Sequence, residues 1–312
     1  MKIVAIEPMG MSQTRIEDFK HNLSMMGHQF TGFPDRKEDP ETLKQRIENA
    51  DIVIVSNIPL NREILSSDLQ LKFLAVAFTG TDHIDMDYCM ENGIEVQNAA
   101  GYANVAVSEL VLGLIIDLYR KITSLDSSIR NGGTRNQFLG RQIKGKTVGM
   151  IGTGAIGQQT AFNLQALGAR IVAYNRSVNR ELTERGISYV SLEDLLRESD
   201  IVSLHLPLTS ETENLISAEK LDLFKKSAIL INTARGKLVD TFALSKALQE
   251  GKIAGAAIDV FETEPPLPAD HPLLKAPNCI LSPHIGYATH EAIELRTEII
   301  MGKVVDWLKN HS

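Results

Sequence analysis

Cysteine is scarce in this sequence of 312 residues. The two cysteines, Cys89 and Cys279, lie far apart and in no metal-ligand spacing. This argues against a disulfide scaffold and against a zinc site, so we expect no metal. A reducing cytoplasm is the compartment that fits such a composition.

Long hydrophobic runs are lacking as well. No segment approaches the roughly 20 apolar residues that a membrane-spanning helix needs. The longest candidate, 105–118, is interrupted by Ser108, Glu109 and Asp117, which is typical of a helix buried between domains. The first ten residues, MKIVAIEPMG, have too short an apolar run for a signal peptide and instead alternate like a buried strand. We therefore expect no membrane partner.

Positive charge is in deficit. The 32 basic residues face 39 acidic ones, and the formal net charge is -7. This balance argues against nucleic acid or an anionic membrane as the main partner. With 43% hydrophobic residues, the composition is that of a globular protein, and the length suits two domains of ordinary size.

What the sequence does contain is a regular alternation of short β-branched runs with helical patterns, first in residues 1–100 and again in 146–283. Strands separated by helices predict parallel sheets with right-handed crossovers, so the expected fold is α/β with two doubly wound domains. One long helical pattern from Asn104 to Arg130 joins the halves, and a final helix at 288–310 is expected to pack against the first domain. The predicted domains are therefore 1–100 with 288–312, and 101–287.

A glycine motif marks the start of the second half. The segment VGMIGTGAIGQQT places Gly152, Gly154 and Gly157 between a predicted strand and a helix that opens with Ala155 and Ile156. The glycines permit a tight turn, close approach of a pyrophosphate and close packing of helix on strand, while the helix N–H groups attract phosphate. A glycine-rich turn is the alternative, but the flanking strands favour a dinucleotide site.

The stretch IVAYNRSVNR lacks the acidic residue that binds the ribose of NAD about 20 positions after the first glycine. Asn175, Arg176 and Ser177 stand there instead. An asparagine does not repel a 2′-phosphate, and arginine and serine can donate hydrogen bonds to it. This favours NADP(H). In the alternative, Arg176 is a solvated surface residue and Asn175 binds NAD(H) through its amide.

Three polar residues follow strand ends in the second half: Arg235 after AILINTA, Glu264 after GAAIDVFET and His284 after CILSP. The carboxyl ends of parallel strands share one edge of the sheet, where ligands bind. Singly, each residue has an ordinary explanation as a surface cation, a turn acid or a core histidine. Together beside a nicotinamide site, they form a set that hydride transfer can use.

Several motifs, in matching order and spacing over essentially the whole chain, resemble the D-isomer-specific 2-hydroxyacid dehydrogenase family. They are GTGAIG, HLPLT, LINTARGKLVD, AIDVFETEP and SPHIGYAT. The resemblance implies a Rossmann cofactor domain and a flavodoxin-like substrate domain with a cleft between them. It implies that Arg235 binds the substrate's carboxylate and carbonyl oxygen, that His284 protonates this oxygen, and that Glu264 is the partner of His284.

Further site residues follow from the same resemblance. It implies that the backbone of Thr79 and Gly80 holds the substrate carboxylate and that Asp259 lies near the nicotinamide, although a structural role for this buried acid is equally open. The chain departs from many NAD-dependent members, which carry aspartate, at Asn175, and in this it is similar to several glyoxylate and hydroxypyruvate reductases. The positions that match cofactor-lining residues are His205, Pro207, Thr209, Thr233 and Ala234.

The expected substrate is a small unphosphorylated 2-oxo acid such as glyoxylate, hydroxypyruvate or pyruvate. The cleft candidates are mostly apolar and include no basic cluster: Met9, Met11, Asn57, Ile58, Phe78, Tyr102 and Tyr287. Alternatives are a dinucleotide-sensing protein like the co-repressors of this fold, or a phosphoglycerate, formate or phosphite dehydrogenase. The helix from Asn104 is apolar on more than one face, and a homodimer is expected, as in resembling proteins.

Overall fold

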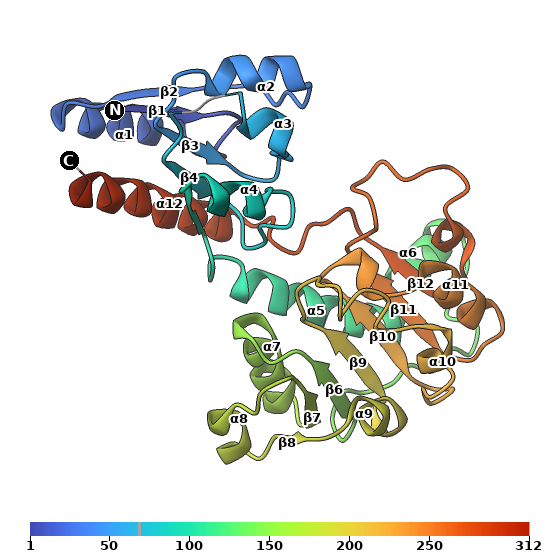
Figure 1. Ribbon diagram of the computed structural model, residues 1–312. Helices are drawn as coiled ribbons and strands as arrows, with labels where there is room; N and C mark the ends of the chain where they lie inside the picture. Colours follow the sequence, from blue (N-terminus) through green and yellow to red (C-terminus); the bar gives the residue numbers. More distant parts are fainter. Residues whose placement is uncertain (68–69, 312) are drawn as a thin grey trace. The chain divides into compact units, whose positions relative to one another are not determined.

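The computed structural model describes residues 1–67 and 70–311, which form two compact units (Figure 1). Unit 1 comprises Met1–Ala103 and Ala288–Ser312, and unit 2 comprises Asn104–Tyr287. Within the described residues, no helix combines the length and the apolar character that crossing a membrane requires.

Unit 1 is built on a parallel five-stranded sheet in the order β2-β1-β3-β4-β5. Its strands are β1 (Lys2–Ala5), β2 (Gln29–Gly32), β3 (Ile52–Val55), β4 (Phe73–Val76) and β5 (Glu95–Asn98). Its helices are α1 (Gln13–Met25), α2 (Pro40–Ile47), α3 (Arg62–Leu65), α4 (Met86–Glu91) and α12 (His290–Asn310). Every residue of β3 and β4 is buried, because helices cover a parallel sheet on both faces.

Helix α12 joins unit 1 although it lies at the other end of the chain. The Trp307 ring stacks on Phe73 of β4 with ring centroids 5.3 Å apart, and its Nε1 donates to the carboxylate of Glu95 at 2.8 Å. A buried aromatic side chain with a satisfied polar edge is an effective anchor.

Unit 2 is built on a parallel seven-stranded sheet in the order β12-β11-β10-β9-β6-β7-β8. Its strands are β6 (Thr147–Ile151), β7 (Arg170–Tyr174), β8 (Ser188–Tyr189), β9 (Ile201–Leu204), β10 (Ile229–Asn232), β11 (Gly255–Ile258) and β12 (Cys279–Leu281). Its helices are α5 (Asn104–Arg120), α6 (Ile122–Arg130), α7 (Ala155–Ala166), α8 (Arg180–Glu184), α9 (Leu192–Glu198), α10 (Ala218–Leu221) and α11 (Thr241–Gln249), with 3₁₀ turns η1 (Gly236–Leu238) and η2 (Pro272–Lys275).

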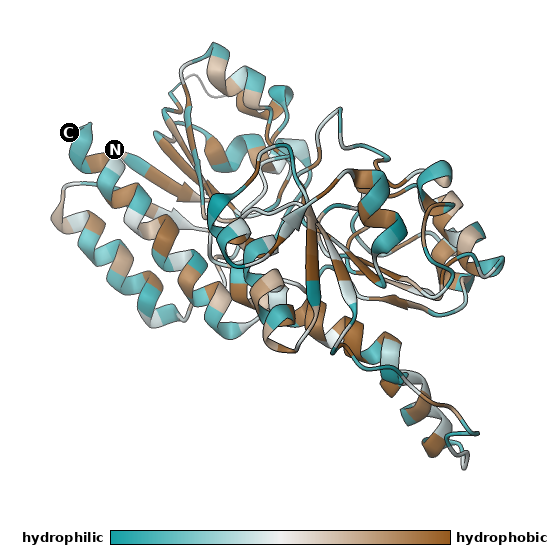
Figure 2. Ribbon diagram, turned by 90° about the horizontal axis from the view of Figure 1, so that it is seen from below, coloured by the Kyte–Doolittle hydropathy of each residue, from teal (hydrophilic) through white to brown (hydrophobic). Residues whose placement is uncertain are grey.

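Both sheets confirm the predicted α/β class with doubly wound parallel sheets. Figure 2 shows hydrophobic strands between helices that carry hydrophilic residues. In unit 2 the strand order reverses at β6, which lies between β9 and β7. Such a reversal is the point at which dinucleotides bind in Rossmann folds, and the glycine motif directly follows β6.

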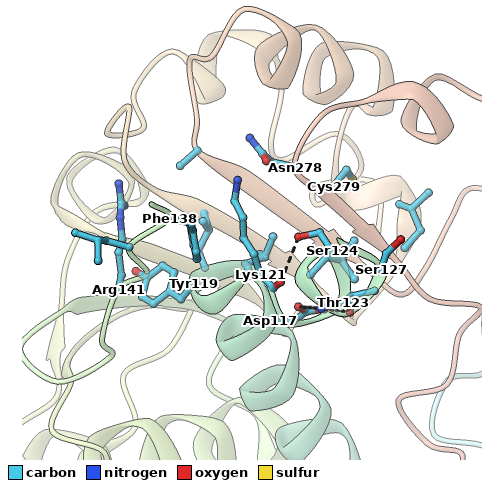
Figure 3. Close-up of a pocket in the computed structure, with 16 residues that line it drawn as sticks. Asp117, Tyr119, Lys121, Thr123, Ser124, Ser127, Phe138, Arg141, Asn278 and Cys279 are labelled. Atoms are coloured by element: carbon cyan, nitrogen blue, oxygen red, sulfur yellow. Dashed lines mark hydrogen bonds between the residues drawn. The ribbon is translucent and has the colours of Figure 1, made fainter. Parts of the chain in front are cut away.

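The prediction of one continuous helix from Asn104 to Arg130 is wrong. The helix ends at Arg120, and Lys121 adopts a left-handed conformation with φ 51° before α6 begins. The side chain of Asp117 competes for the backbone here, because its carboxylate accepts the Thr123 N–H at 2.9 Å and also binds the Thr123 hydroxyl (Figure 3).

Candidate active site

The strands of unit 2 end at one edge of the sheet, and predicted site residues follow these ends. Following β6, β7, β9, β10, β11 and β12 are, in turn, Gly152, Asn175, His205, Arg235, Asp259 and His284. Because all strand pairs are parallel, these residues share the carboxyl edge of one sheet. The topology thus gathers residues that are far apart in the sequence.

His284 and Glu264 meet at this edge. The distance from His284 Nδ1 to Glu264 Oε1 is 2.7 Å, and the side chains are 17% and 63% exposed. Nδ1 pairs with the carboxylate, so this contact fixes the orientation of the imidazole ring and with it the direction of Nε2. The pair therefore has the arrangement of an oriented proton donor.

His284 is held in an uncommon backbone conformation. Its φ is 53°, in the left-handed region that residues other than glycine seldom adopt. Such a conformation costs on the order of 1–3 kcal/mol and persists only where the surroundings enforce it. The strain therefore indicates that contacts with other parts of unit 2 hold this loop in its conformation.

Asp259 is the residue that fixes this loop. It is fully buried, and its carboxylate accepts bonds from the Ser282 hydroxyl at 2.6 Å, the Ile285 N–H at 2.9 Å and the Gly286 N–H at 2.8 Å. Its carbonyl accepts the His284 N–H at 2.8 Å. These bonds satisfy the buried acid and set the position of the histidine, so Asp259 has a bracing role in the structure.

Arg235 leaves β10 through a braced loop. Asn232, which is 1% exposed, donates its amide N–H to the carbonyl of Arg235 at 2.8 Å and accepts the Ala234 N–H at 3.1 Å. The Nη1 of Arg235 also donates to the Ala234 carbonyl at 2.7 Å. Sequence reasoning missed Asn232, although a lone amide at the end of the apolar run AILIN was a signal.

The glycine motif forms a tight turn between β6 and α7. Gly152 has φ 100°, and a Cβ there would lie 2.5 Å from the carbonyl oxygen of His205. A Cβ on Gly157 would lie 2.2 Å from the oxygen of Gly152. Neither position can hold a side chain. Glycine is therefore required at both, because backbone packs closely on backbone there.

The same turn fits a nicotinamide dinucleotide. Apart from Gly154 itself and its two chain neighbours, no atom of the described residues lies within 4 Å of a Cβ built there, so the N-cap of α7 faces open space. No acidic residue lies in the first turn of this helix, where Ala155 and Ile156 present their N–H groups. The buried hydroxyl of Thr233, at the same edge, has no hydrogen-bond partner among the described residues. A polar ligand at this edge would satisfy such groups.

The loop after β9 packs against the turn that the glycine motif forms, at Gly152. Burial lowers the pKa of His205 to about 4, so its imidazole is neutral at physiological pH, and its Nε2 lies 2.8 Å from the Ser203 hydroxyl. The Thr212 hydroxyl donates to the Pro207 carbonyl at 2.8 Å and accepts the Thr209 N–H at 2.7 Å. These bonds close the loop on itself, and residues 205–213 contain no lysine or arginine.

The loop after β7 is a compact polar turn. The Asn175 amide donates to the Ser177 carbonyl at 2.9 Å, while Arg176 and Ser177 are exposed. Sequence reasoning missed Tyr189, whose hydroxyl accepts the Asn179 N–H at 3.2 Å and lies 3.0 Å from the Thr153 hydroxyl. One tyrosine thus connects this turn to the glycine motif.

Two more predicted residues lie in unit 1, directly beyond β4. The Thr79 carbonyl accepts the Asn98 amide at 2.6 Å, and its buried hydroxyl has no hydrogen-bond partner among the described residues. Gly80 follows it at the carboxyl edge of that sheet. In unit 2, the Tyr287 ring packs edge-on to the His284 ring with centroids 5.6 Å apart.

Comparisons with known proteins agree on one family. A family model described as "D-isomer specific 2-hydroxyacid dehydrogenase, NAD binding domain" matches residues 112–286. The chain is 40% identical over 286 residues to a glyoxylate reductase of Thermococcus litoralis, which covers 88% of this chain and 86% of that protein.

Two solved structures are similar over almost their full length. An acyclic imino acid reductase in complex with NADPH and D-Arg has a TM-score of 0.89 and 31% identity, covering 99% of this chain and 98% of that one. A D-lactate dehydrogenase from Aquifex aeolicus complexed with NAD and lactic acid has a TM-score of 0.86 and 31% identity, covering 99% and 96%.

Proposed function

The chain belongs to the D-isomer-specific 2-hydroxyacid dehydrogenase family, and we propose that it reduces a small unphosphorylated 2-oxo acid with NADPH. Members of this family are oxidoreductases that act on the CH–OH group and transfer a hydride between a nicotinamide cofactor and a 2-hydroxy or 2-oxo acid. The observation that carries the proposal is the 2.7 Å pairing of His284 with Glu264 at the edge that also holds the glycine motif.

Each residue of the proposed site has a chemical task. The guanidinium of Arg235 donates to the substrate carboxylate and carbonyl oxygen, for which its planar fork is suited. His284 gives a proton from Nε2 to the carbonyl oxygen while Glu264 holds Nδ1. Thr79 and Gly80 bind the substrate carboxylate through their backbone, and Tyr287 packs beside the imidazole. The bound nicotinamide supplies the hydride.

Glyoxylate, hydroxypyruvate and pyruvate are the proposed substrates. The relatives named glyoxylate reductase support this class, and so does the D-lactate dehydrogenase. Purified protein with NADPH should oxidise the cofactor when one of these acids is added. A dinucleotide-sensing protein would bind NADPH without turnover. A formate or phosphite dehydrogenase would instead reduce NAD⁺ with those anions. Assays of the three 2-oxo acids with reduced cofactor, and of formate and phosphite with oxidised cofactor, therefore separate the alternatives.

NADPH is the proposed cofactor because the turn after β7 offers Arg176 and Ser177 and no carboxylate. His205, Pro207, Thr209 and Ala234 are proposed to line the rest of the cofactor. This assignment depends on the ribose 2′-phosphate, so a single acidic substitution should test it.

Asn175→Asp should lower kcat/KM for NADPH about 10- to 100-fold relative to NADH, because a carboxylate beside the 2′-phosphate is a like-charge contact. Steady-state kinetics with both cofactors measures the ratio. Asn179→Asp is the matched control, since Asn179 caps α8 in the same turn and aspartate also serves as a cap. A wild-type preference for NADH would contradict the assignment.

A homodimer is the proposed assembly, formed around α6. None of the described residues Ile122–Arg130 of this helix is buried, and Ile122, Ile129 and Leu139 are 54%, 65% and 82% exposed. Leu139 also lines a pocket of about 730 Å³, together with Phe138, Thr123 of α6 and residues of β12 among others (Figure 3). Exposed apolar side chains on and after α6, one of which lines a pocket, favour an isologous contact with a second copy.

Ile129→Glu combined with Leu139→Glu should convert the dimer to a monomer, because two charges would be buried in an apolar contact. Size-exclusion chromatography with light scattering gives the mass. Met25→Glu on α1, which is 76% exposed in unit 1, should leave the mass unchanged. A wild-type protein that is monomeric at all concentrations would contradict the proposal.

A further inference from the structure

Unit 1 contains a loop whose converging backbone N–H groups bind one of its own carboxylates. In the order β2-β1-β3-β4-β5 the sequence direction of the sheet reverses between β1 and β3. In open α/β sheets, ligands bind beyond the carboxyl ends of the strands at such a reversal. The loops that follow β1 and β3 are therefore where this unit would hold a polar ligand.

Three consecutive N–H groups converge in the loop after β3. Those of Ser56, Asn57 and Ile58 all point to one oxygen, Glu7 Oε1, at 2.7, 3.2 and 3.4 Å. Successive backbone N–H groups that face a common point form a concavity that binds anions. Glu7, two residues after the end of β1, is only 5% exposed, so its carboxylate occupies this concavity.

Arg36, the cation that bonds Glu7, is also paired with carboxylates of the protein itself. Arg36 Nη1 donates to the other oxygen of Glu7 at 2.8 Å and to the Asn57 side chain at 2.6 Å, and its Nη2 lies 2.7 Å from Glu38. Two carboxylates thus face one guanidinium. The three charged residues together have a net negative charge, and the donors of Arg36 bond Glu7, Glu38 and the Asn57 amide oxygen.

We propose that Glu7 is a specificity-determining residue, which excludes 2-oxo acids with a second anionic group, above all a phosphate ester. The inference rests on the proposed function, in which the substrate lies at this edge beside Thr79, beyond the adjacent strand β4. The phosphate of a phosphorylated acid could not bond the three N–H groups, because the Glu7 carboxylate already accepts their hydrogen bonds. The same carboxylate would repel the phosphate. A neutral distal group, as in glyoxylate or hydroxypyruvate, meets no such repulsion.

Hydroxypyruvate and 3-phosphohydroxypyruvate differ only by the phosphate and form the test pair. Glu7→Gln keeps an acceptor for the three N–H groups but removes the charge, and Glu7→Ala also empties the concavity. The ratio of kcat/KM for the phosphorylated over the unphosphorylated acid should rise about 10-fold in Glu7→Gln and about 100-fold in Glu7→Ala. Glu41→Gln on α2, where the acid is 80% exposed, is the matched control and should leave the ratio unchanged.

A ratio that stays within about twofold of wild type in a folded Glu7→Gln protein overturns the proposal, even if Glu7→Ala fails to fold. Titration of inorganic phosphate by calorimetry provides a readout that needs no turnover. Folded Glu7→Ala should bind one more phosphate than wild type, whereas equal binding by both overturns the proposal. If wild type reduces no 2-oxo acid, the proposed function fails, and this titration still decides the role of Glu7.

Discussion

Replacing His284 with asparagine should lower kcat by about 10²- to 10⁴-fold, the usual contribution of a positioned general acid. Asparagine is the preferred substitution because it tolerates the left-handed backbone that His284 adopts, with φ 53°, whereas alanine would add strain to the loss of the ring. The amide cannot deliver a proton near neutral pH. The loss of kcat therefore reports the missing proton donor and not a change in the backbone.

Two measurements separate this effect from loss of structure. The dissociation constant for NADPH should stay within about twofold of wild type, because the imidazole is proposed to act on the substrate's carbonyl oxygen and not on the phosphates. His21→Asn on α1, where the histidine is exposed, should leave kcat unchanged. If His284→Asn retains most of its turnover, another group donates the proton.

The main strands were predictable because they carry their signal locally. The runs TVGMI and RIVAY form β6 and β7 over the predicted residues, since buried parallel strands are continuously apolar. By contrast, β2 and β8 were not expected. Only Phe30 is buried in β2, and β8 has two residues, neither of them buried, so their sequences carry little hydrophobic pattern.

The end of α5 was unpredictable for a different reason. The sequence Arg120-Lys121 contains no proline or glycine to stop a helix. The break depends on the carboxylate of Asp117, which bonds the Thr123 backbone and hydroxyl. Propensity describes single residues, whereas such a competition between side chain and backbone depends on three-dimensional geometry.

The candidate site, too, was only partly predictable from the sequence. Parallel topology was sufficient to expect Arg235, Glu264 and His284 near one edge, because each follows a strand of one sheet. The residues that brace them were beyond sequence reasoning, since their partners are distant. Ser282 bonds Asp259 23 positions away, and Tyr189 bonds Thr153 36 positions away.

Arg235→Lys should lower kcat/KM for the 2-oxo acid about 10²-fold, and Arg235→Ala about 10³-fold. Lysine keeps the charge but not the planar fork that can bind a carboxylate and a carbonyl oxygen at once. The two-step loss distinguishes geometry from charge. Arg197→Lys on the exposed surface of α9 is the matched control and should leave kcat/KM unchanged.

The comparison is informative because Asn232 still holds the loop in both variants, although both lose the bond from Arg235 Nη1 to the Ala234 carbonyl. Asn232 bonds the backbone carbonyl of residue 235 and the N–H of Ala234, so the chain path survives a change of side chain. We expect the dissociation constant for NADPH to remain within about twofold of wild type. An equal loss for lysine and alanine would mean that the fork is essential, whereas no loss with lysine would assign Arg235 a purely electrostatic role.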